Sequence, residues 1–274
     1  MRRALVGVVA LALGGGPVGV FLMLRRMSLT GDAMAHAILP GAAVGYLVAG
    51  LSLPAMTFGG IAAGIVVALL SGLVARVTAL KEDASLAAFY LLSLALGVTL
   101  VSLRGSNVDL LHVLFGTVLA LDDPTLILLG SVATVTLFAL ALLYRPLVLE
   151  CVDPVFLRSV SRAGAPTHLV FLSLVVLNLV GGFHALGTLL AVGLMMLPAA
   201  ASRFWSADVT AMLVLSAAFG IASGFAGLLL SYHAELPSGP AVILVAGGLY
   251  LVSLVLGPES GLLRLALPGR HLEA

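Results

Sequence analysis

Long apolar runs separated by short polar segments make up almost the whole chain. Nine of these runs approach the roughly 20 residues that a helix needs to cross the hydrocarbon core of a bilayer. They cover residues 4–24, 32–51, 55–75, 86–103, 124–144, 168–183, 185–201, 209–230 and 239–257. Most are too long and too uniformly apolar for membrane β-strands, which alternate polar and apolar residues over about ten positions. The pattern predicts an all-α integral membrane protein, a polytopic bundle of eight or nine transmembrane helices.

The boundary between the sixth and seventh runs is weakly marked. Gly181, Gly182 and His184 interrupt the apolar pattern between residues 168 and 201. We therefore expect this region to form either two spans or one span followed by a re-entrant half.

Composition supports a membrane protein with almost no soluble mass. Of 274 residues, 61% are hydrophobic and only 9% are charged, whereas roughly a quarter of the residues in soluble domains are charged. No Ser/Pro-rich linker or block of charge divides the chain, so residues 1–274 are expected to form one transmembrane domain. The net charge of +1 implies no basic surface for nucleic acid. The single cysteine, Cys151, cannot form an internal disulfide.

Lysine and arginine predict how the chain is oriented, because they favour cytoplasmic loops. If the loop after the first span is cytoplasmic, strict alternation places three of these residues outside: Arg2, Arg3 and Arg104. The other ten lie inside: Arg25, Arg26, Arg76, Lys81, Arg145, Arg158, Arg162, Arg203, Arg264 and Arg270. With nine spans, this bias predicts an external N-terminus and a cytoplasmic C-terminus in a multi-pass protein of the cell (inner) membrane. Arg2 and Arg3 run against the prediction, since a basic start normally stays inside.

Small residues four positions apart predict close contacts between the helices. Such spacing lets backbones approach each other in lipid, where burial of apolar surface alone gives no driving force. Four G-x-x-x-G pairs lie within the spans: Gly15/Gly19, Gly41/Gly45, Gly60/Gly64 and Gly220/Gly224. Asn178, in the sixth span, is expected to form a hydrogen bond between helices.

Asp32 and His36 are the most informative polar residues, because charged groups at membrane depth are costly and often functional. They lie four residues apart at the start of the second span and share one face of a helix. A carboxylate and an imidazole together can bind a divalent first-row metal such as zinc, manganese or iron. The alternative is structural: Asp32 could cap the helix, and His36 could be hydrogen-bonded within the bundle.

Other candidate ligands carry less support. Asp109 and His112 lie three residues apart between the fourth and fifth spans, and His184 interrupts the region of the sixth and seventh. His233 and Glu235 lie in the polar segment at 231–237, between the last two spans. We interpret each of these as structural or solvated rather than as a metal ligand.

The longest internal polar stretch runs from Arg145 to Thr167. Within it, residues 154–162 resemble a short helix, with Asp153 placed as its cap, Pro154 in its first turn and Gly164 after its end. A short cytoplasmic helix has no core of its own to join. It therefore lies against the spans or docks into a partner.

Several of these stretches together resemble the permease subunit of the zinc/manganese/iron family of ATP-binding-cassette importers, over essentially the whole chain. The matching stretches are RRMSLTGDAMAH at 25–36 with PG at 40–41, KED at 81–83, VDLLHVLFG at 108–116, HALGTLLAVGLMMLPAAASR at 184–203 and SYHAELPSGP at 231–240. Thr117 departs from the resemblance, since relatives often carry Asp at that place.

The resemblance implies a permease homodimer or pair, two cytoplasmic ATP-binding subunits and an external metal-binding protein. It implies that Asp32 and His36 contribute to the metal pathway, and that the coupling helix to the ATPase falls on Asp153 to Gly164. Phe156 or Leu157 is then the expected apolar anchor of that helix. We expect the chain to transport a divalent metal, zinc first and manganese or iron as alternatives, and to hold no permanently bound cofactor. No P-loop motif occurs, so this subunit is expected not to hydrolyse ATP alone.

Two other classes of protein were compared with this interpretation. An intramembrane hydrolase would need a motif such as HExxH or GxSxG, and the sequence has neither. A secondary transporter driven by an ion gradient would also be polytopic, but would more often show an internal repeat of two halves. We find no such repeat, and this class is kept as the alternative.

Overall fold

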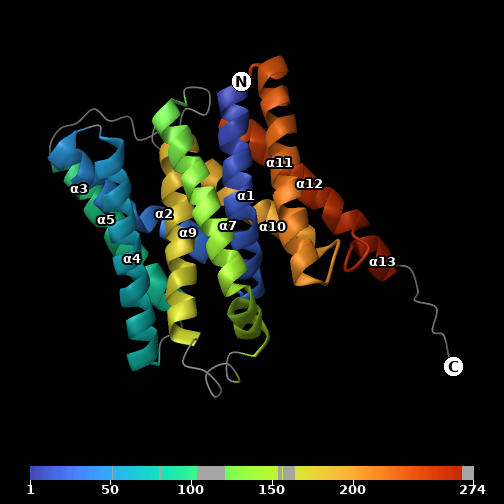
Figure 1. Ribbon diagram of the computed structural model, residues 1–274, viewed down its shortest axis with the longest axis horizontal. Coiled ribbons are helices and arrows are strands. Elements are labelled where there is room, and N and C mark those ends of the chain that lie inside the picture. The colour runs from blue at the N-terminus through green and yellow to red at the C-terminus, as the bar shows by residue number, and fades with distance from the viewer. Residues whose placement is uncertain (51, 80–81, 104–120, 154–155, 157–163, 267–274) are drawn as a thin grey trace.

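The first apolar run forms one long helix, α1 (Arg2–Leu24), which packs mainly against α7, α9, α10 and α11. In this computed structural model the described residues are 1–50, 52–79, 82–103, 121–153, 156 and 164–266, and every element in them is a helix (Figure 1). After α1 the chain continues through α2 (Thr30–Ala37), α3 (Leu39–Ala49), α4 (Leu53–Val77), α5 (Glu82–Leu103), α7 (Asp123–Val152), α9 (Gly164–Leu186), α10 (Thr188–Arg203), α11 (Val209–Ala234), α12 (Ser238–Leu256) and α13 (Leu262–Ala266).

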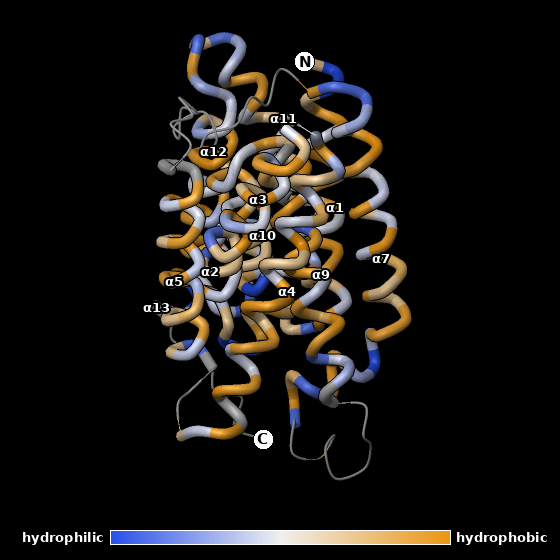
Figure 2. The backbone as a smooth tube through the Cα atoms, turned by 90° about the vertical axis from the view of Figure 1, so that its left-hand side faces the viewer, coloured by the Kyte–Doolittle hydropathy of each residue, from blue (hydrophilic) through white to orange (hydrophobic). Residues whose placement is uncertain are grey.

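Eight helices in the described part of the chain are long and apolar enough to cross a membrane. One of them is the pair α2 and α3 taken together, Thr30–Ala49, and the shorter α10 adds a further apolar helix. Hydrophobic residues dominate the bodies of the helices, and hydrophilic residues gather toward their ends (Figure 2). The predicted fold class, an all-α polytopic membrane bundle, is confirmed.

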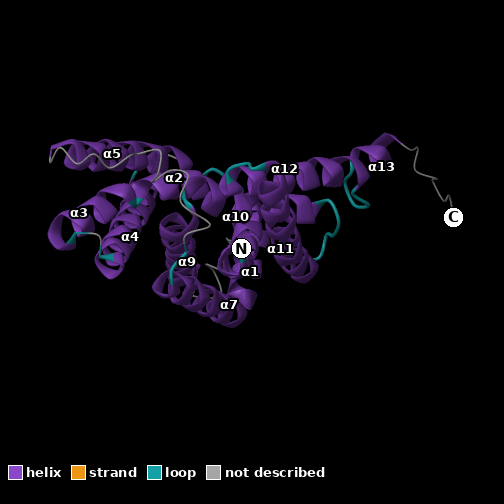
Figure 3. Ribbon diagram, turned by 90° about the horizontal axis from the view of Figure 1, so that it is seen from above, coloured by secondary structure: helices purple, strands orange, loops and turns teal. Residues whose placement is uncertain are grey.

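Two groups of helices lie on either side of the bundle's centre. From above, α3, α4 and α5 lie together on one side, while α11, α12 and α13 lie on the other (Figure 3). The central helices α1 and α9 have the most enclosed spans, each 72% buried. Buried Phe21 of α1 and Phe171 of α9 meet edge to face, with ring centroids 6.2 Å apart.

The boundary between α9 and α10 differs from the expected one. Helix α9 continues through Gly181, Gly182 and His184, and the break falls at Gly187, the only residue between the two helices. Gly187 has φ 87° and ψ 161°, a conformation that essentially only glycine adopts. Gly182 does not break its helix. A Cβ there would lie 2.6 Å from the Cβ of Ala191, so the glycine allows α10 to pack closely.

Helix α7 is longer than the apolar run that predicts it. The polar stretch was expected to begin at Arg145, but α7 continues through Arg145 and Pro146 to Val152. Apolar residues follow the proline, and buried Leu147 packs in the core. The apolar run in the sequence therefore ends where the first charged residue appears, and α7 ends later.

All four G-x-x-x-G pairs lie where helices touch, as predicted. A Cβ on Gly19 would collide with the backbone carbonyl of Met195, and one on Gly41 would collide with that of Gly59. Gly64 faces Val176 and Gly224 faces Val8 in the same manner. The pairs thus join α1 to α10, α3 to α4, α4 to α9 and α11 to α1.

Candidate metal path and coupling region

A break in the second span separates α2 from α3 beside His36. Pro40 has no N–H, so it cannot donate to the carbonyl of His36 as a helical residue would. The carbonyl of Ala37, which in an unbroken helix would accept from the N–H of Gly41, instead accepts a hydrogen bond from Ser93 of α5 at 2.8 Å. The break therefore leaves this backbone group paired, which is the condition for irregular backbone within a bilayer.

Asp32 and His36 both lie on α2, one turn apart. Oδ1 of Asp32 and Nε2 of His36 are 3.9 Å apart, and the side chain of Asp32 is 66% exposed while that of His36 is 27% exposed. The ring of Tyr90, from α5, lies next to His36 with centroids 6.3 Å apart. The predicted pair is thus brought together on an open face of the chain.

The geometry does not support a capping role for Asp32. The N-cap of α2 is Leu29, no side chain makes a cap hydrogen bond, and Asp32 lies within the first turn of the helix. Its carboxylate is therefore available to a ligand. Two donors do not complete a metal site, and the described residues contain no group of three or more His, Cys, Asp or Glu side chains that could hold a metal.

The weaker candidates lie elsewhere. Asp109 and His112 fall outside the described residues, and only the backbone of His184 is described, in α9. His233 belongs to the last turn of α11, which runs beyond the expected loop start, and its Nδ1 lies 2.9 Å from the carbonyl oxygen of Leu229. Glu235 follows as the exposed, left-handed C-cap of α11. His233 and Glu235 lie in the solvated setting expected for them.

The segment predicted to couple to the ATPase begins with the cap that the sequence predicts. The carboxylate of Asp153 accepts a hydrogen bond from the backbone N–H of Phe156 at 2.8 Å, which is the geometry of a helix cap. Phe156 is half exposed, as an anchor for a partner would be. Gly164 is buried at the first position of α9. Pro154 and Leu157 lie outside the described residues.

Sequence reasoning missed a buried ionic cluster at the same end of the bundle. Nη2 of Arg25 donates to Oε1 of Glu150 at 3.0 Å and also to Nδ1 of His168. The guanidinium also lies over the ring of Phe171, 5.1 Å from its centroid. The side chains of Arg25 and Glu150 are each only 9% exposed. A lone glutamate in the apolar sequence LVLECV was the available signal, but nothing in the sequence pairs it with Arg25.

Asn178 forms the predicted bond between helices. Its Nδ2 donates to the hydroxyl of Thr136 on α7 at 2.7 Å and to the carbonyl of Leu174 at 2.9 Å. Gly14 of α1 lies against the same amide. Asn178 is therefore a structural residue rather than part of a path.

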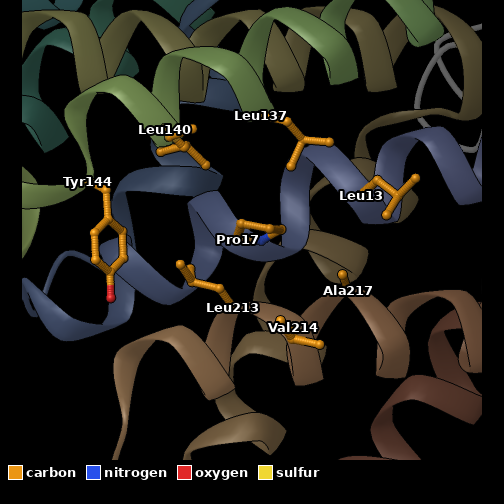
Figure 4. Close-up of a pocket in the computed structure, with 9 residues that line it drawn as sticks. Leu13, Pro17, Leu137, Leu140, Tyr144, Leu213, Val214 and Ala217 are labelled. Carbon is orange, nitrogen blue, oxygen red and sulfur yellow. The ribbon is translucent and has the colours of Figure 1, made fainter.

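An apolar pocket of about 380 Å³ lies between α1, α7 and α11, around Pro17 (Figure 4). Aliphatic side chains line almost all of it, and the hydroxyl of Tyr144 is engaged with that of Thr210 at 2.7 Å. Such a lining offers no ligand to an ion. The pocket is therefore separate from the candidate metal path on α2.

Comparison with known proteins gives the family. The model of the ABC 3 transport family matches residues 1–257. The chain belongs to this family. The predicted resemblance to permeases of metal importers is confirmed, and the chain is a multi-pass cell-membrane protein and a transport component rather than an enzyme. The alternatives of a secondary transporter and an intramembrane hydrolase are thereby set aside.

Individual members of the family are similar over nearly their full length. The manganese transport system membrane protein MntC of Halalkalibacterium halodurans is 31% identical, with 96% of this chain and 89% of the relative covered. The manganese import system permease protein ScaB of Streptococcus parasanguinis is 30% identical, with 94% and 91% covered. The solved structure of PsaBC from Streptococcus pneumoniae in complex with Fab superposes with a TM-score of 0.85 at 28% identity, covering 97% of this permease and 95% of that chain.

Proposed function

We propose that this permease imports manganese and that Asp32 and His36 are the ligands through which the ion passes. The observation that carries the proposal is the exposed pair on α2 beside the break at Ile38. Discontinuous helices are typical of the point where a substrate crosses a membrane. The carboxylate has no capping duty, so its charge is free to act on a cation.

Manganese takes the place of zinc as the first expectation. The relatives described above are named for manganese transport or import. Carboxylate oxygen suits manganese, and imidazole binds the first-row metals generally. Zinc and iron(II) remain the competing cargoes, because the same two donors also accept them.

We propose further that two copies of the permease act together. Each chain supplies two donors in its described part, and the strong exposure of Asp32 leaves its carboxylate able to face a second copy. A pair would offer two carboxylates and two imidazoles, enough for brief and weak ligation of a passing ion. The family resemblance adds a cytoplasmic ATP-binding subunit, which provides the energy, and an external protein, which delivers the metal.

The test is radiometal uptake in a strain that lacks the chromosomal importer and carries wild type, Asp32→Asn or His36→Leu. Asp32→Asn keeps the shape of the side chain but removes its charge, and His36→Leu removes the imidazole without adding charge to lipid. We expect both variants to reach the membrane at normal levels and to lose manganese uptake by about tenfold or more, because even the loss of a residue that supports a metal ligand costs about 10–100-fold in affinity or activity.

His233→Leu is the matched control, because it removes an exposed histidine from the helix end of α11. It should leave uptake unchanged. Normal uptake by Asp32→Asn would defeat the ligand proposal. Faster uptake of zinc or iron(II) than of manganese by wild type would defeat the choice of metal.

A further inference from the structure

Arg25, Glu150 and His168 come from three separate parts of the chain. Arg25 follows the last residue of α1, Glu150 lies in the last turn of α7, and His168 lies in the first turns of α9. Oε1 of Glu150 is also 4.0 Å from Nδ1 of His168. Because α7 and α9 are the helices that flank the coupling region, the cluster joins both sides of that region to the end of α1.

The cluster is incompletely satisfied. Nη2 of Arg25 serves both acceptors, while Nη1 of Arg25 and Oε2 of Glu150 are buried without a hydrogen-bond partner. Arginine and carboxylate groups commonly form two parallel hydrogen bonds, which here would use Nη1 and Nη2 of Arg25 and both carboxylate oxygens of Glu150. A second arrangement of the same side chains, with Arg25 released from His168 and paired doubly with Glu150, would therefore satisfy both of the unpaired atoms.

A hydrogen-bonded turn connects this cluster to the helix that carries Asp32 and His36. The N–H of Met27 donates a hydrogen bond to the carbonyl of Leu22 at 2.9 Å, and the N–H of Arg26 donates one to the carbonyl of Met23 at 3.0 Å. These two bonds form a Schellman motif, with Arg26 at φ 60° in the left-handed position usually held by glycine. Helix α2 starts at Thr30, so only residues 26–29 separate Arg25 from the helix that carries Asp32 and His36.

We propose that Arg25, Glu150 and His168 form a two-state ionic clamp that transmits movement of the coupling region to α2. The three are positioning residues, since none of them touches the metal pair. This inference rests on the proposed function, because it assumes that ATP hydrolysis by a separate subunit drives transport. A packed element with two discrete arrangements is what coupling between distant sites requires.

The experiment uses the whole complex of permease and ATPase in lipid vesicles, with the external binding protein supplied. The ratio of metal imported to ATP hydrolysed is measured for wild type, Arg25→Lys, and the double variant Arg25→Gln with Glu150→Gln. Lysine keeps the charge but lacks the fork that makes two parallel bonds. The double variant removes both charges together, so no unpaired charge is left buried.

We expect both to assemble at wild-type levels and to lower the ratio by about tenfold, which is within the usual range of coupling between sites. The matched control is Arg3→Gln. Arg3 forms an exposed ion pair of 2.8 Å with Asp123, which joins α1 to α7 at the ends of these helices far from the cluster. That variant should keep the wild-type ratio.

A wild-type ratio in either Arg25→Lys or the double variant would overturn the clamp. A fall of the same size in the ratio for Arg3→Gln would also overturn it, because loss of any ion pair between α1 and α7 would then have the same effect. Wild type is first tried with manganese, zinc and iron(II), and the ratio is taken with the metal that it imports. An error in the proposed metal is thereby separated from a failure of the clamp.

Discussion

At the scale of single residues, Asn178 and Ser93 differ from Asp32 in what their polar groups contact. Asn178 and Ser93 have hydrogen-bond partners on other helices and hold those helices in place. Asp32 has an exposed carboxylate and no hydrogen bond to the end of its helix. A carboxylate near lipid without such a structural duty is costly. That cost is the reason why we propose a role in transport for Asp32, whereas Asn178 serves packing.

The glycines provide a test at this scale. A Cβ on Gly19 would meet the backbone carbonyl of Met195, which cannot move without displacing α10. We expect Gly19→Ala to destabilise the permease by roughly 1–3 kcal/mol, the usual cost of overpacking. Thermal unfolding in detergent, followed by size-exclusion chromatography, measures the effect as a lower midpoint.

Gly130→Ala is the control for this substitution. Gly130 lies within α7 and nothing is found within 4 Å of the place its Cβ would take. The alanine should leave the midpoint unchanged or raise it slightly, because alanine favours a helix more than glycine does. Equal midpoints for the two variants would show that the contact between α1 and α10 is looser than described.

At the scale of elements, hydropathy finds the helices but misplaces some of their ends. The run ending at residue 144 stops where Arg145 brings in charge, yet α7 continues to Val152 because Glu150 is paired and Leu147 is buried. Gly182 and Gly187 look alike in the sequence, and only the positive φ at Gly187 marks the break. Those features depend on contacts made in three dimensions.

The candidate site divides in the same way. The spacing of Asp32 and His36 is local, so a helical period is sufficient to predict that they face the same side. The pairing of Arg25 with Glu150 joins residues 125 positions apart. The helical periodicity of the sequence cannot predict such a contact, because it depends on how α1, α7 and α9 pack together.

The coupling region carries a prediction at the scale of an element. Phe156 is half exposed just after the cap formed by Asp153, so its ring is available to a groove on the ATPase. Phe156→Asp should release the ATPase or uncouple hydrolysis from uptake, because it places a charge in an apolar contact. Co-purification of the two subunits and metal uptake measure the two effects.

The matched control is Phe138→Asn, on the outer face of α7, where the ring is 73% exposed within the span. It should not alter recovery of the ATPase with the permease that reaches the membrane. If Phe156→Asp transports normally and retains the ATPase, the docking contact lies elsewhere.

At the scale of the whole molecule, the ends of the bundle differ in charge and in role. The N-terminus lies near the end of α11 at one end of the bundle, and the end of α7 and the start of α9 lie at the other (Figure 1). The ion pairs agree with this, since Arg3 meets the start of α7 and Arg25 meets its last turn. The positive-inside rule then assigns the end with the coupling region to the cytoplasm.

That orientation can be tested with single cysteines in a Cys151→Ala background. Leu236→Cys lies in the exposed turn between α11 and α12, and Ala207→Cys lies in the exposed turn between α10 and α11. In intact cells a membrane-impermeant maleimide should label the first and not the second. The reverse pattern would place the N-terminus in the cytoplasm, and labelling of Ala207→Cys after lysis shows that the site is reactive.

The break beside His36 also bears on how α2 could move. Since the hydroxyl of Ser93 donates to the carbonyl of Ala37, a swing of α2 against α3 would have to exchange this hydrogen bond. A typical hydrogen bond contributes about 0.5–1.5 kcal/mol net, which is comparable with the thermal energy. Most of the free energy that opposes such a swing therefore comes from the packing of α2 against α5 and α9.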